Sequence, residues 1–528
     1  VKVNAEKSSD WEFTIYQNEL GLGNHAANPW LQELPDSITK VVWDNYVTMA
    51  PADCYELFNI NTNDPKASWD GIHLGQEEKA FMVSLSANGS EIKLPVYPLP
   101  GQTRGTVGVS FGYGRGENGE NIGKGAFQCD EKGSHLVDEN DQLVPIGANG
   151  FKLASFSGNN LSYNGVAEIS LLEERYALAS TQTHHTIMGR TSIVKETSYD
   201  FWKANSNNKE SYNEKIKLHS HKEGGHSEVD ATSFSLWDEH PVENVGHRWG
   251  MSIDLSSCNG CGVCITACHS ENNVPVVGKD EVRRSRDMHW LRMDRYFSSI
   301  EDDNRKEWAE AKHKGDFDYE KLEVPEDNPS VVFMPMLCQH CNHAPCETVC
   351  PVAATTHSNE GLNMMTYNRC IGTRYCANNC PYKVRRFNWF NYRDYRKFKN
   401  VNPNQDEMAR LVLNPDVVVR SRGVMEKCSF CIQSIQEAKL TAKKESRALV
   451  DGDVKCACGD ACPNDCITFG DWNDPNSNIR KVLESDRAYQ ALEEVGVKPN
   501  IWYQVKVRNV DEENSVAQLT NEEHHNEH

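Results

Sequence analysis

Hydrophobic and polar positions alternate along much of residues 1–198, which predicts short β-strands rather than helices. Residues 80–85 and 92–96 flank Ala87-Asn88-Gly89, a sequence that favours a tight hairpin turn. Further short strands are predicted at residues 41–43, 46–47, 105–114 and 151–156. The N-terminal part of the chain is therefore predicted to be rich in β-structure.

The pattern changes after residue 198. Residues 199–236 are polar, weakly periodic and rich in Lys, Asn, Ser and His, which is typical of a linker. Beyond them, helical periodicity predicts helices at residues 304–314, 406–412, 434–447 and 485–494. We expect four parts in total: a β-domain over 1–198, a polar linker over 199–236, a second domain over 237–510 and a polar tail over 511–528.

Composition excludes some classes of protein. The 528 residues have a mean hydropathy of −0.64 and contain no apolar run of the length that crosses a bilayer. The net charge of −21 argues against a nucleic-acid partner. The sequence begins at Val1 without Met and without a signal-peptide pattern, which indicates that residue 1 is not the start of the gene product.

Fifteen of the 19 cysteines fall into four groups in the second domain, and each group ends in a C-x3-C step. The first group has the spacing C-x2-C-x2-C-x3-C, and the second has C-x2-C-x4-C-x3-C. In the third, Thr373 stands where a repeat of the first pattern would place a cysteine, and a long insertion divides the fourth. The members in order are Cys258, Cys261, Cys264 and Cys268; Cys338, Cys341, Cys346 and Cys350; Cys370, Cys376 and Cys380; and Cys428, Cys431, Cys458 and Cys462.

This spacing is the ligand pattern of bacterial-type iron–sulfur ferredoxins, in which the fourth cysteine of a run reaches the neighbouring cluster. Proline follows the last cysteine in three of the groups, at Pro351, Pro381 and Pro463. We therefore predict an α+β multidomain protein with two ferredoxin-like units and four clusters. Lys383, Arg385 and Arg386 follow the third group, and cations of this kind stabilise anionic clusters. A zinc scaffold is the weaker alternative, because zinc ribbons use two C-x2-C knuckles.

Residues from about 245 to 510 resemble the four-cluster electron-transfer subunits of the complex iron–sulfur molybdoenzyme family. The resemblance implies that the first group pairs with the fourth and the second with the third. Three [4Fe-4S] clusters are then implied, at Cys258, Cys261, Cys264 and Cys462; at Cys268, Cys428, Cys431 and Cys458; and at Cys338, Cys341, Cys346 and Cys380. The remaining site would have only Cys350, Cys370 and Cys376.

Thr373 decides the nature of this last site. A hydroxyl is a poor ligand for iron in a sulfide cluster, so three thiolates favour a [3Fe-4S] cluster. A [4Fe-4S] cluster with a ligand other than cysteine remains the alternative.

Four cysteines lie outside the assigned ligands. Cys54 and Cys129 are isolated, and we expect buried apolar thiols. Cys456 and Cys466 lie beside the fourth group, at positions that the family pattern does not use. Two alternatives remain open for these two: replacement of an assigned ligand, or pairing with each other.

Residues 28–36 (NPWLQELPD) and 43–46 (WDNY) resemble the last domain of molybdopterin oxidoreductases, as does the segment around His184 and His185. The resemblance implies a double-psi β-barrel of six strands, like the domain that binds the molybdopterin dinucleotide. The domains that carry the metal ligand would lie upstream. His184 and His185 would contact a pterin in a true molybdoenzyme, whereas here we expect ordinary packing and no cofactor in the barrel.

Such a barrel fused to a four-cluster unit with three cysteines in its third group resembles the large iron–sulfur subunit of alternative complex III, a bacterial quinol oxidoreductase. The resemblance implies a polysulfide-reductase-type membrane subunit that oxidises quinol, with electrons entering this chain at the [3Fe-4S] cluster. They would leave to multi-haem and mono-haem c-type cytochrome subunits, and then to a cytochrome c or a terminal cytochrome oxidase. A peripheral place on the periplasmic face of the inner membrane is implied, with no molybdenum and no substrate catalysis in this chain. The alternative is a fused molybdoenzyme of the polysulfide or tetrathionate reductase type.

Overall fold

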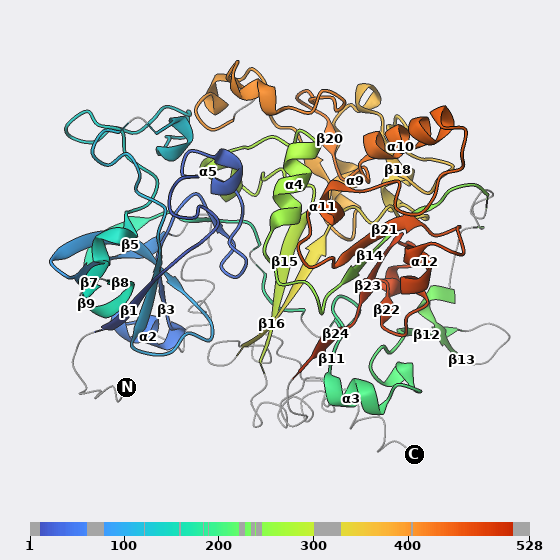
Figure 1. Cartoon of the computed structure of the whole chain (residues 1–528), viewed down its shortest axis with the longest axis horizontal. Coiled ribbons are helices and arrows are strands. Elements are labelled where there is room, and N and C mark those ends of the chain that lie inside the picture. The colour runs from blue at the N-terminus through green and yellow to red at the C-terminus, as the bar shows by residue number, and fades with distance from the viewer. Residues whose placement is uncertain are drawn as a thin grey trace.

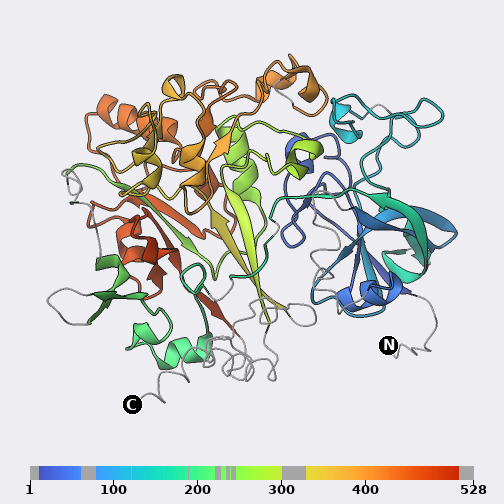
Figure 2. The same ribbon diagram turned by 180° about the vertical axis from the view of Figure 1, so that it is seen from behind.

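The computed structural model describes residues 11–60, 79–120, 122–157, 160–182, 184–187, 190–220, 227–233, 238, 245–299, 329–402 and 405–509. A barrel and a larger α+β domain lie side by side (Figure 1). The view from behind in Figure 2 shows the long antiparallel pair β15 (Arg292–Ser299) and β16 (Pro329–Met336) between the barrel and the rest of the larger domain. No helix in these ranges is long and apolar enough to cross a membrane.

Six strands close into the barrel in the order β1–β6–β3–β5–β4–β9. Two neighbouring pairs, β1 with β6 and β3 with β5, are parallel, and the other four are antiparallel. The predicted barrel of six strands is thereby confirmed, whereas its double-psi topology stays a prediction. The strands are β1 (Trp11–Tyr16), β3 (Val47–Met49), β4 (Ala80–Ala87), β5 (Ser90–Pro98), β6 (Thr106–Ser110) and β9 (Asn164–Tyr176).

Alternate side chains of the strands fill the barrel, as the two-residue period of a strand requires. Val83 and Leu85 of β4 are fully buried there, together with the isolated Cys54. The predicted hairpin is formed by β4 and β5, and its turn residues Asn88 and Gly89 have φ of 52° and 76°, as a type I′ turn requires. Around the barrel lie α1 (Pro29–Gln32), β2 (Val41–Val42), α2 (Pro51–Leu57), η1 (Lys124–Ala126), η2 (Gly150–Leu153), β7 (Ser155–Ser157), β8 (Asn160–Ser162) and β10 (Ala179–Ser180).

A four-stranded sheet in the order β21–β14–β23–β22 forms the centre of the larger domain. The central strand β14 (Trp249–Asp254) pairs antiparallel with β21 (Ile467–Asp471) and parallel with β23 (Ile501–Gln504), while β22 (Ala488–Tyr489) closes one edge. Segments about 250 residues apart in the chain therefore meet in one sheet, and Trp249, Met251 and Ile253 of β14 are buried in its core.

Helices and small hairpins surround this sheet. The helices are α4 (Val263–Glu271), α5 (Lys279–Arg283), α8 (Pro345–Thr348), α9 (Tyr375–Asn378), α10 (Ile432–Lys444), α11 (Ala457–Asp460) and α12 (Asn478–Leu483). The hairpins are β17 (Thr355–His357) with β18 (Asn363–Met365) and β19 (Arg386–Phe387) with β20 (Met425–Glu426), and the 3-10 turns are η6 (Tyr367–Arg369), η7 (Arg396–Phe398), η9 (Ala409–Val412) and η10 (Glu493–Val495). The helix predicted at 434–447 is confirmed as α10, whereas residues 485–494 contain β22 and the start of η10 but no α-helix, and residues 406–412 contain only η9. The predicted helix at 304–314 lies outside the described residues.

The described part of the predicted linker is attached to the larger domain. Its elements are α3 (Tyr199–Ala204), η3 (Lys209–Ser211), the hairpin β12 (Lys217–Ser220) with β13 (Ser227–Asp230), and η5 (Ala231–Ser233). Just before them, β11 (Glu196–Ser198) pairs in parallel with β24 (Lys506–Arg508). The Asn213 side-chain amide donates to the carbonyl oxygens of Asp486 and Ala488 at 2.9 and 3.0 Å. The domain boundaries remain a prediction, and the predicted tail at 511–528 lies outside the described residues.

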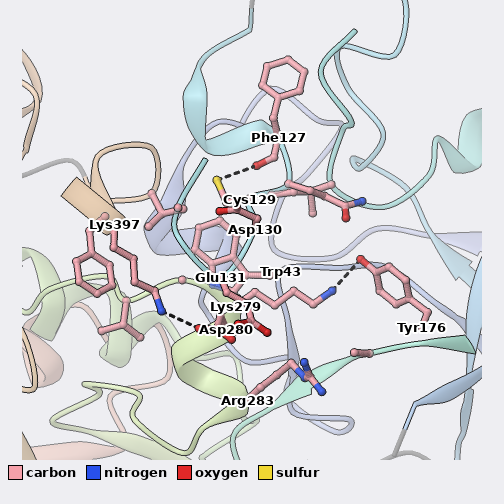
Figure 3. Close-up of a pocket in the computed structure, with 18 of the residues that line it drawn as sticks. Trp43, Phe127, Cys129, Asp130, Glu131, Tyr176, Lys279, Asp280, Arg283 and Lys397 are labelled. Atoms are coloured by element: carbon pink, nitrogen blue, oxygen red, sulfur yellow. Dashed lines mark hydrogen bonds and ion pairs between the residues drawn. The ribbon is translucent and has the colours of Figure 1, made fainter. Parts of the chain in front are cut away.

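The barrel part also meets the larger domain directly, first at a cavity. A cavity of about 330 Å³ is lined by Trp43, Cys129 and Tyr176 from the first part of the chain and by Lys279 of α5 (Figure 3). The Lys279 ammonium donates to the Tyr176 hydroxyl at 2.7 Å and pairs with the buried Asp44 carboxylate. These paired charges therefore link the two parts across the cavity.

The strand β15 provides the second place. The Arg295 guanidinium donates to the His184 carbonyl oxygen at 3.0 Å, and the rings of His184 and His185 lie against Tyr296 and Phe297. Both histidines thus pack against the larger domain.

Glu33 connects the two parts through its carboxylate, which is fully buried. It accepts hydrogen bonds from the backbone N–H groups of Val277 and Gly278 at 3.0 and 2.7 Å, and from the Trp43 indole N–H at 3.1 Å. Burial raises the pKa of Glu33 to about 8, although the three donors favour the ionised form and oppose this rise.

We expect the Glu33 carboxyl group to make stability depend on pH. An unfolded glutamate releases its proton near pH 4.5, whereas the buried group keeps it to about pH 8, so the folded protein holds one more proton between these values. The free energy of unfolding should therefore fall as the pH rises through this window, and Glu33→Gln should remove that part of the slope. Thermal unfolding of both proteins at several pH values measures the effect, with the exposed Glu12→Gln as control. Parallel pH curves for wild type and Glu33→Gln would contradict this assignment.

Candidate iron–sulfur sites

Each C-x3-C step coincides with one turn of a short helix. The helices α4, α8, α9 and α11 each begin one residue before a cysteine, and the second cysteine of the step follows four residues later. Proline comes after the step that involves α8, α9 or α11 and cannot continue a helix, whereas α4 runs on to Glu271. The pairs are Cys264 with Cys268, Cys346 with Cys350, Cys376 with Cys380, and Cys458 with Cys462.

Left-handed residues turn the loops that lead into α4, α9 and α10. Gly260 and Gly262 have φ of 78° and 73°, and Arg374 and Phe430 have φ of 61° and 55°. Residues of this conformation let neighbouring backbone N–H groups point into one concavity, as in many anion and iron–sulfur sites. At Gly260 a Cβ atom would lie 2.5 Å from the Phe333 ring, so that only glycine fits there.

The packing of α4 against α11 brings the first and fourth cysteine groups together. Burial raises the pKa of the Cys264 thiol, and the charges of three neighbouring thiols raise it further. Burial raises the pKa of Cys458 in the same way, and the neighbouring thiols Cys431, Cys428 and Cys268 raise it further. We call the resulting sets the first site (Cys258, Cys261, Cys264 and Cys462) and the second site (Cys268, Cys428, Cys431 and Cys458).

The packing of α8 against α9 brings the second and third cysteine groups together in the same way. Burial and then three neighbouring thiols raise the pKa of Cys341. Burial also raises the pKa of Cys376, and two half-buried cysteines add to this rise. We call these sets the third site (Cys338, Cys341, Cys346 and Cys380) and the fourth site (Cys350, Cys370 and Cys376).

The four sites follow one another in a row. Cys264 of the first site raises the pKa of Cys268 in the second. Cys338 of the third site likewise raises the pKa of Cys428 in the second. The third and fourth sites share the helix pair α8 and α9. A row of neighbouring sites is the arrangement in which an electron can pass from each site to the next.

Exposure differs between the ends of this row and its middle. All cysteines of the second and third sites are buried. At the first site Cys261 is exposed and Cys462 is half-buried, and at the fourth site Cys350 and Cys370 are half-buried. Thr373, the residue in place of a cysteine, is also exposed. The row therefore has a shielded middle and two ends that reach the surface.

Arg385 is a buried cation between the third and fourth sites. It is 6% exposed and donates to the Thr355 hydroxyl at 3.1 Å, and it pairs with no carboxylate of the described residues. Burial would lower the pKa of Arg385, but the charges of nearby thiols, led by Cys346 and Cys376, raise it overall. A buried cation with neutral partners is costly unless an anion lies beside it.

The other two basic residues singled out in the sequence have different partners. Arg386 pairs with Asp287 at 3.0 Å. Lys383 is exposed, and its ammonium donates to the Asn378 carbonyl oxygen at 2.6 Å.

Backbone N–H groups also point at cysteine sulfurs. The Ala354 N–H donates to Cys350 Sγ at 3.2 Å, and the Phe430 N–H donates to Cys428 Sγ at 3.4 Å. In the part of the chain that is described, no three His, Cys, Asp or Glu side chains converge on a single metal ion. In a cubane, however, each thiolate binds a different iron, so its four ligands stay further apart. The soft donors, the N–H groups and the buried cation together fit anionic iron–sulfur clusters.

Cys456 and Cys466 lie against assigned ligands. The Cys466 and Cys462 sulfurs are 3.3 Å apart, and the Cys456 thiol hydrogen-bonds the Cys431 thiol. The two residues therefore touch different sites. No disulfide joins Cys456 to Cys466 in the described residues.

Known proteins with similar sequences agree with a cluster-binding domain. Residues 329–397 match the 4Fe-4S dicluster domain family. The iron–sulfur cluster-binding subunit of a menaquinone reductase from Nitratidesulfovibrio vulgaris is 37% identical over 260 residues, which cover 48% of this chain and 88% of that subunit. Iron–sulfur subunit 1 of an Hdr-like menaquinol oxidoreductase from Archaeoglobus fulgidus is 31% identical over 270 residues, 48% of this chain and 82% of the relative. The B subunit of the polysulfide reductase of Wolinella succinogenes is 27% identical over 258 residues, 49% of this chain and 94% of the relative.

The chain belongs to the family of iron–sulfur cluster-binding subunits. Its dicluster match at residues 329–397 includes every cysteine of the third and fourth sites. The prediction of iron–sulfur clusters is thereby confirmed, whereas the number of clusters, the [3Fe-4S] assignment and the ligand of each site stay predictions.

In an iron–sulfur subunit, the buried charge of Arg385 should raise the reduction potentials of the neighbouring clusters, because a cation stabilises the more negative reduced form. Arg385→Met should therefore lower the potentials of two clusters, and Arg385→Lys should restore them in part. An EPR-monitored redox titration measures these potentials. Lys383→Met removes the same charge at an exposed position and serves as the control. Unchanged potentials in a fully loaded Arg385→Met protein would contradict this role.

Proposed function

We propose that the chain is the electron-transfer subunit of a membrane-associated quinol oxidoreductase and carries three [4Fe-4S] clusters and one [3Fe-4S] cluster. The first, second and third sites would each hold a [4Fe-4S] cluster through four cysteines. The fourth site would hold the [3Fe-4S] cluster through Cys350, Cys370 and Cys376. When bound, the clusters accept and release single electrons, and the chain keeps them in order and shielded from water.

The main support for this proposal is the way solvent exposure of the cysteines varies along the row of sites. A relay needs one end that receives electrons, another that delivers them and a middle that does not react with solvent. The buried cysteines of the second and third sites and the accessible cysteines of the first and fourth sites meet these requirements. A zinc scaffold has no need of such a row.

Electrons would enter at the fourth site. Thr373 lies there at the surface in the loop between Cys370 and Cys376 and offers a hydroxyl where the other groups offer a thiol. A three-iron cluster belongs to the higher part of a range of roughly −700 to +450 mV, which suits an acceptor of electrons from quinol. Relatives named for menaquinone and menaquinol support a quinol donor.

Within this class of enzymes, we propose that the chain belongs to alternative complex III. This assignment is supported by the fusion of a closed barrel of six strands to an iron–sulfur domain in one chain. The partners would be a polysulfide-reductase-type membrane subunit, which oxidises quinol, and multi-haem and mono-haem c-type cytochromes, with a terminal oxidase beyond them. The complex would hold this chain on the periplasmic face of the inner membrane, and the barrel would act as a scaffold without molybdenum.

A fused molybdoenzyme is the second candidate function. It is favoured by the barrel and by the similarity to the B subunit of polysulfide reductase. In that case substrate chemistry would take place at a metal held by domains upstream of this chain.

Metal analysis separates the candidates. Protein purified without oxygen should contain about 15 irons per chain and neither molybdenum nor tungsten, and the oxidised protein should show a [3Fe-4S] EPR signal. Stoichiometric molybdenum would favour the fused molybdoenzyme. A colourless protein with zinc and no iron would overturn both functions.

Thr373→Cys tests the fourth site directly. The new thiolate should complete a fourth cubane, remove the [3Fe-4S] EPR signal, add about one iron per chain and lower the potential of this site. Thr373→Ser is the matched control, because it keeps a hydroxyl and should keep the signal. An unchanged [3Fe-4S] signal in Thr373→Cys would contradict the assignment of the third cysteine group.

A further inference from the structure

Cys466 has a thiol that the ligand pattern does not use, although it lies within the first site. Its sulfur is 3.3 Å from the Cys462 sulfur, and the two are hydrogen-bonded. It also lies beside the Cys258 thiol. Cys466 thus touches two of the four cysteines assigned to one site.

The position of Cys466 is fixed by the fold. It directly precedes β21, and its carbonyl oxygen accepts a hydrogen bond from the Asp254 N–H at 2.8 Å. Asp254 ends β14, the neighbouring strand. The side chain is 6% exposed, so neither water nor an exposed rotamer competes for the thiol.

The short contact argues against a ligand role for Cys466. Cys462 already supplies a thiolate at this place, and thiolates bound to different irons of one cubane do not lie in contact. A protonated thiol, by contrast, is a hydrogen-bond donor. Its hydrogen bond is strongest when the acceptor is charged, as a thiolate ligand is. The contact therefore suits an S–H group that donates to ligand sulfur.

Cys456 shows how the two extra thiols differ. Its sulfur donates to the Phe430 carbonyl oxygen at 3.5 Å and also contacts Cys431 of the second site. A thiol has one proton, so this carbonyl group competes with the ligand sulfur. For Cys466, the hydrogen-bond partner of the thiol is Cys462, and the thiol beside it, Cys258, is also a ligand cysteine.

We propose that Cys466 is a positioning residue whose S–H group donates a hydrogen bond to ligand sulfur of the first site and raises the reduction potential of the cluster there. This inference rests on the proposed electron-transfer function. Hydrogen bonds to cluster sulfurs stabilise the more negative reduced form and set the potential of the cluster. The first site is an accessible end of the row, so this thiol would influence the exchange of electrons with a partner.

An EPR-monitored redox titration of the full chain, combined with iron analysis, tests the role of Cys466. Cys466→Ala should keep the full iron content, and the potential of a single cluster should shift downward. Cys466→Ser should keep the iron and stay closer to the wild-type potential, because a hydroxyl still donates. Cys54→Ala removes a buried thiol from the barrel core and should change none of the potentials.

Two results would overturn the inference. Unchanged potentials in a fully loaded Cys466→Ala protein would show that the thiol does not act on the cluster. Loss of one cluster's iron in both Cys466 variants would show that Cys466 is a ligand. A wild-type protein without clusters would instead refute the proposed function, so the two failures can be told apart.

Discussion

The negative charge of sulfur in a low-dielectric interior is the constraint on which the larger domain depends. Burial and neighbouring thiols raise the pKa of Cys268, Cys341 and Cys458 far above the usual value, so these groups resist ionisation without a cation. Iron ligation needs thiolates, and cluster binding therefore releases protons and contributes to folding. Left-handed loops, N–H donors and the buried Arg385 supply the compensating positive potential.

The same constraint explains why the sites differ along the row. All cysteines of the second and third sites are buried, and all of them except Cys268 lie within the core cluster that also contains the central sheet, where water is excluded. The first and fourth sites include cysteines at the surface, which lets a partner approach within electron-transfer distance. The barrel contributes no cysteine to the row and is held to it by Glu33, Lys279 and Arg295.

Sequence could predict features that depend on local spacing. A C-x3-C step is one helical turn, and the Asn88-Gly89 turn dictates its hairpin, so both could be predicted from a few residues. The pairing of Cys264 with Cys462 could not, because nearly 200 residues separate them, and it came from a family resemblance. The contact of Cys466 with Cys258 depends on how β21 joins β14, which spacing does not reveal. The predicted helix at 485–494 was wrong because Ala488 and Tyr489 pair with β23, so tertiary pairing overrides local periodicity.

Iron anomalous scattering from crystals of the cluster-loaded protein tests the central claim most directly. The account predicts four separate iron peaks in a single row, each next to the cysteines of one site, with the peak beside Cys350, Cys370 and Cys376 at one end. Fewer than four peaks, or a peak in the barrel, would contradict it.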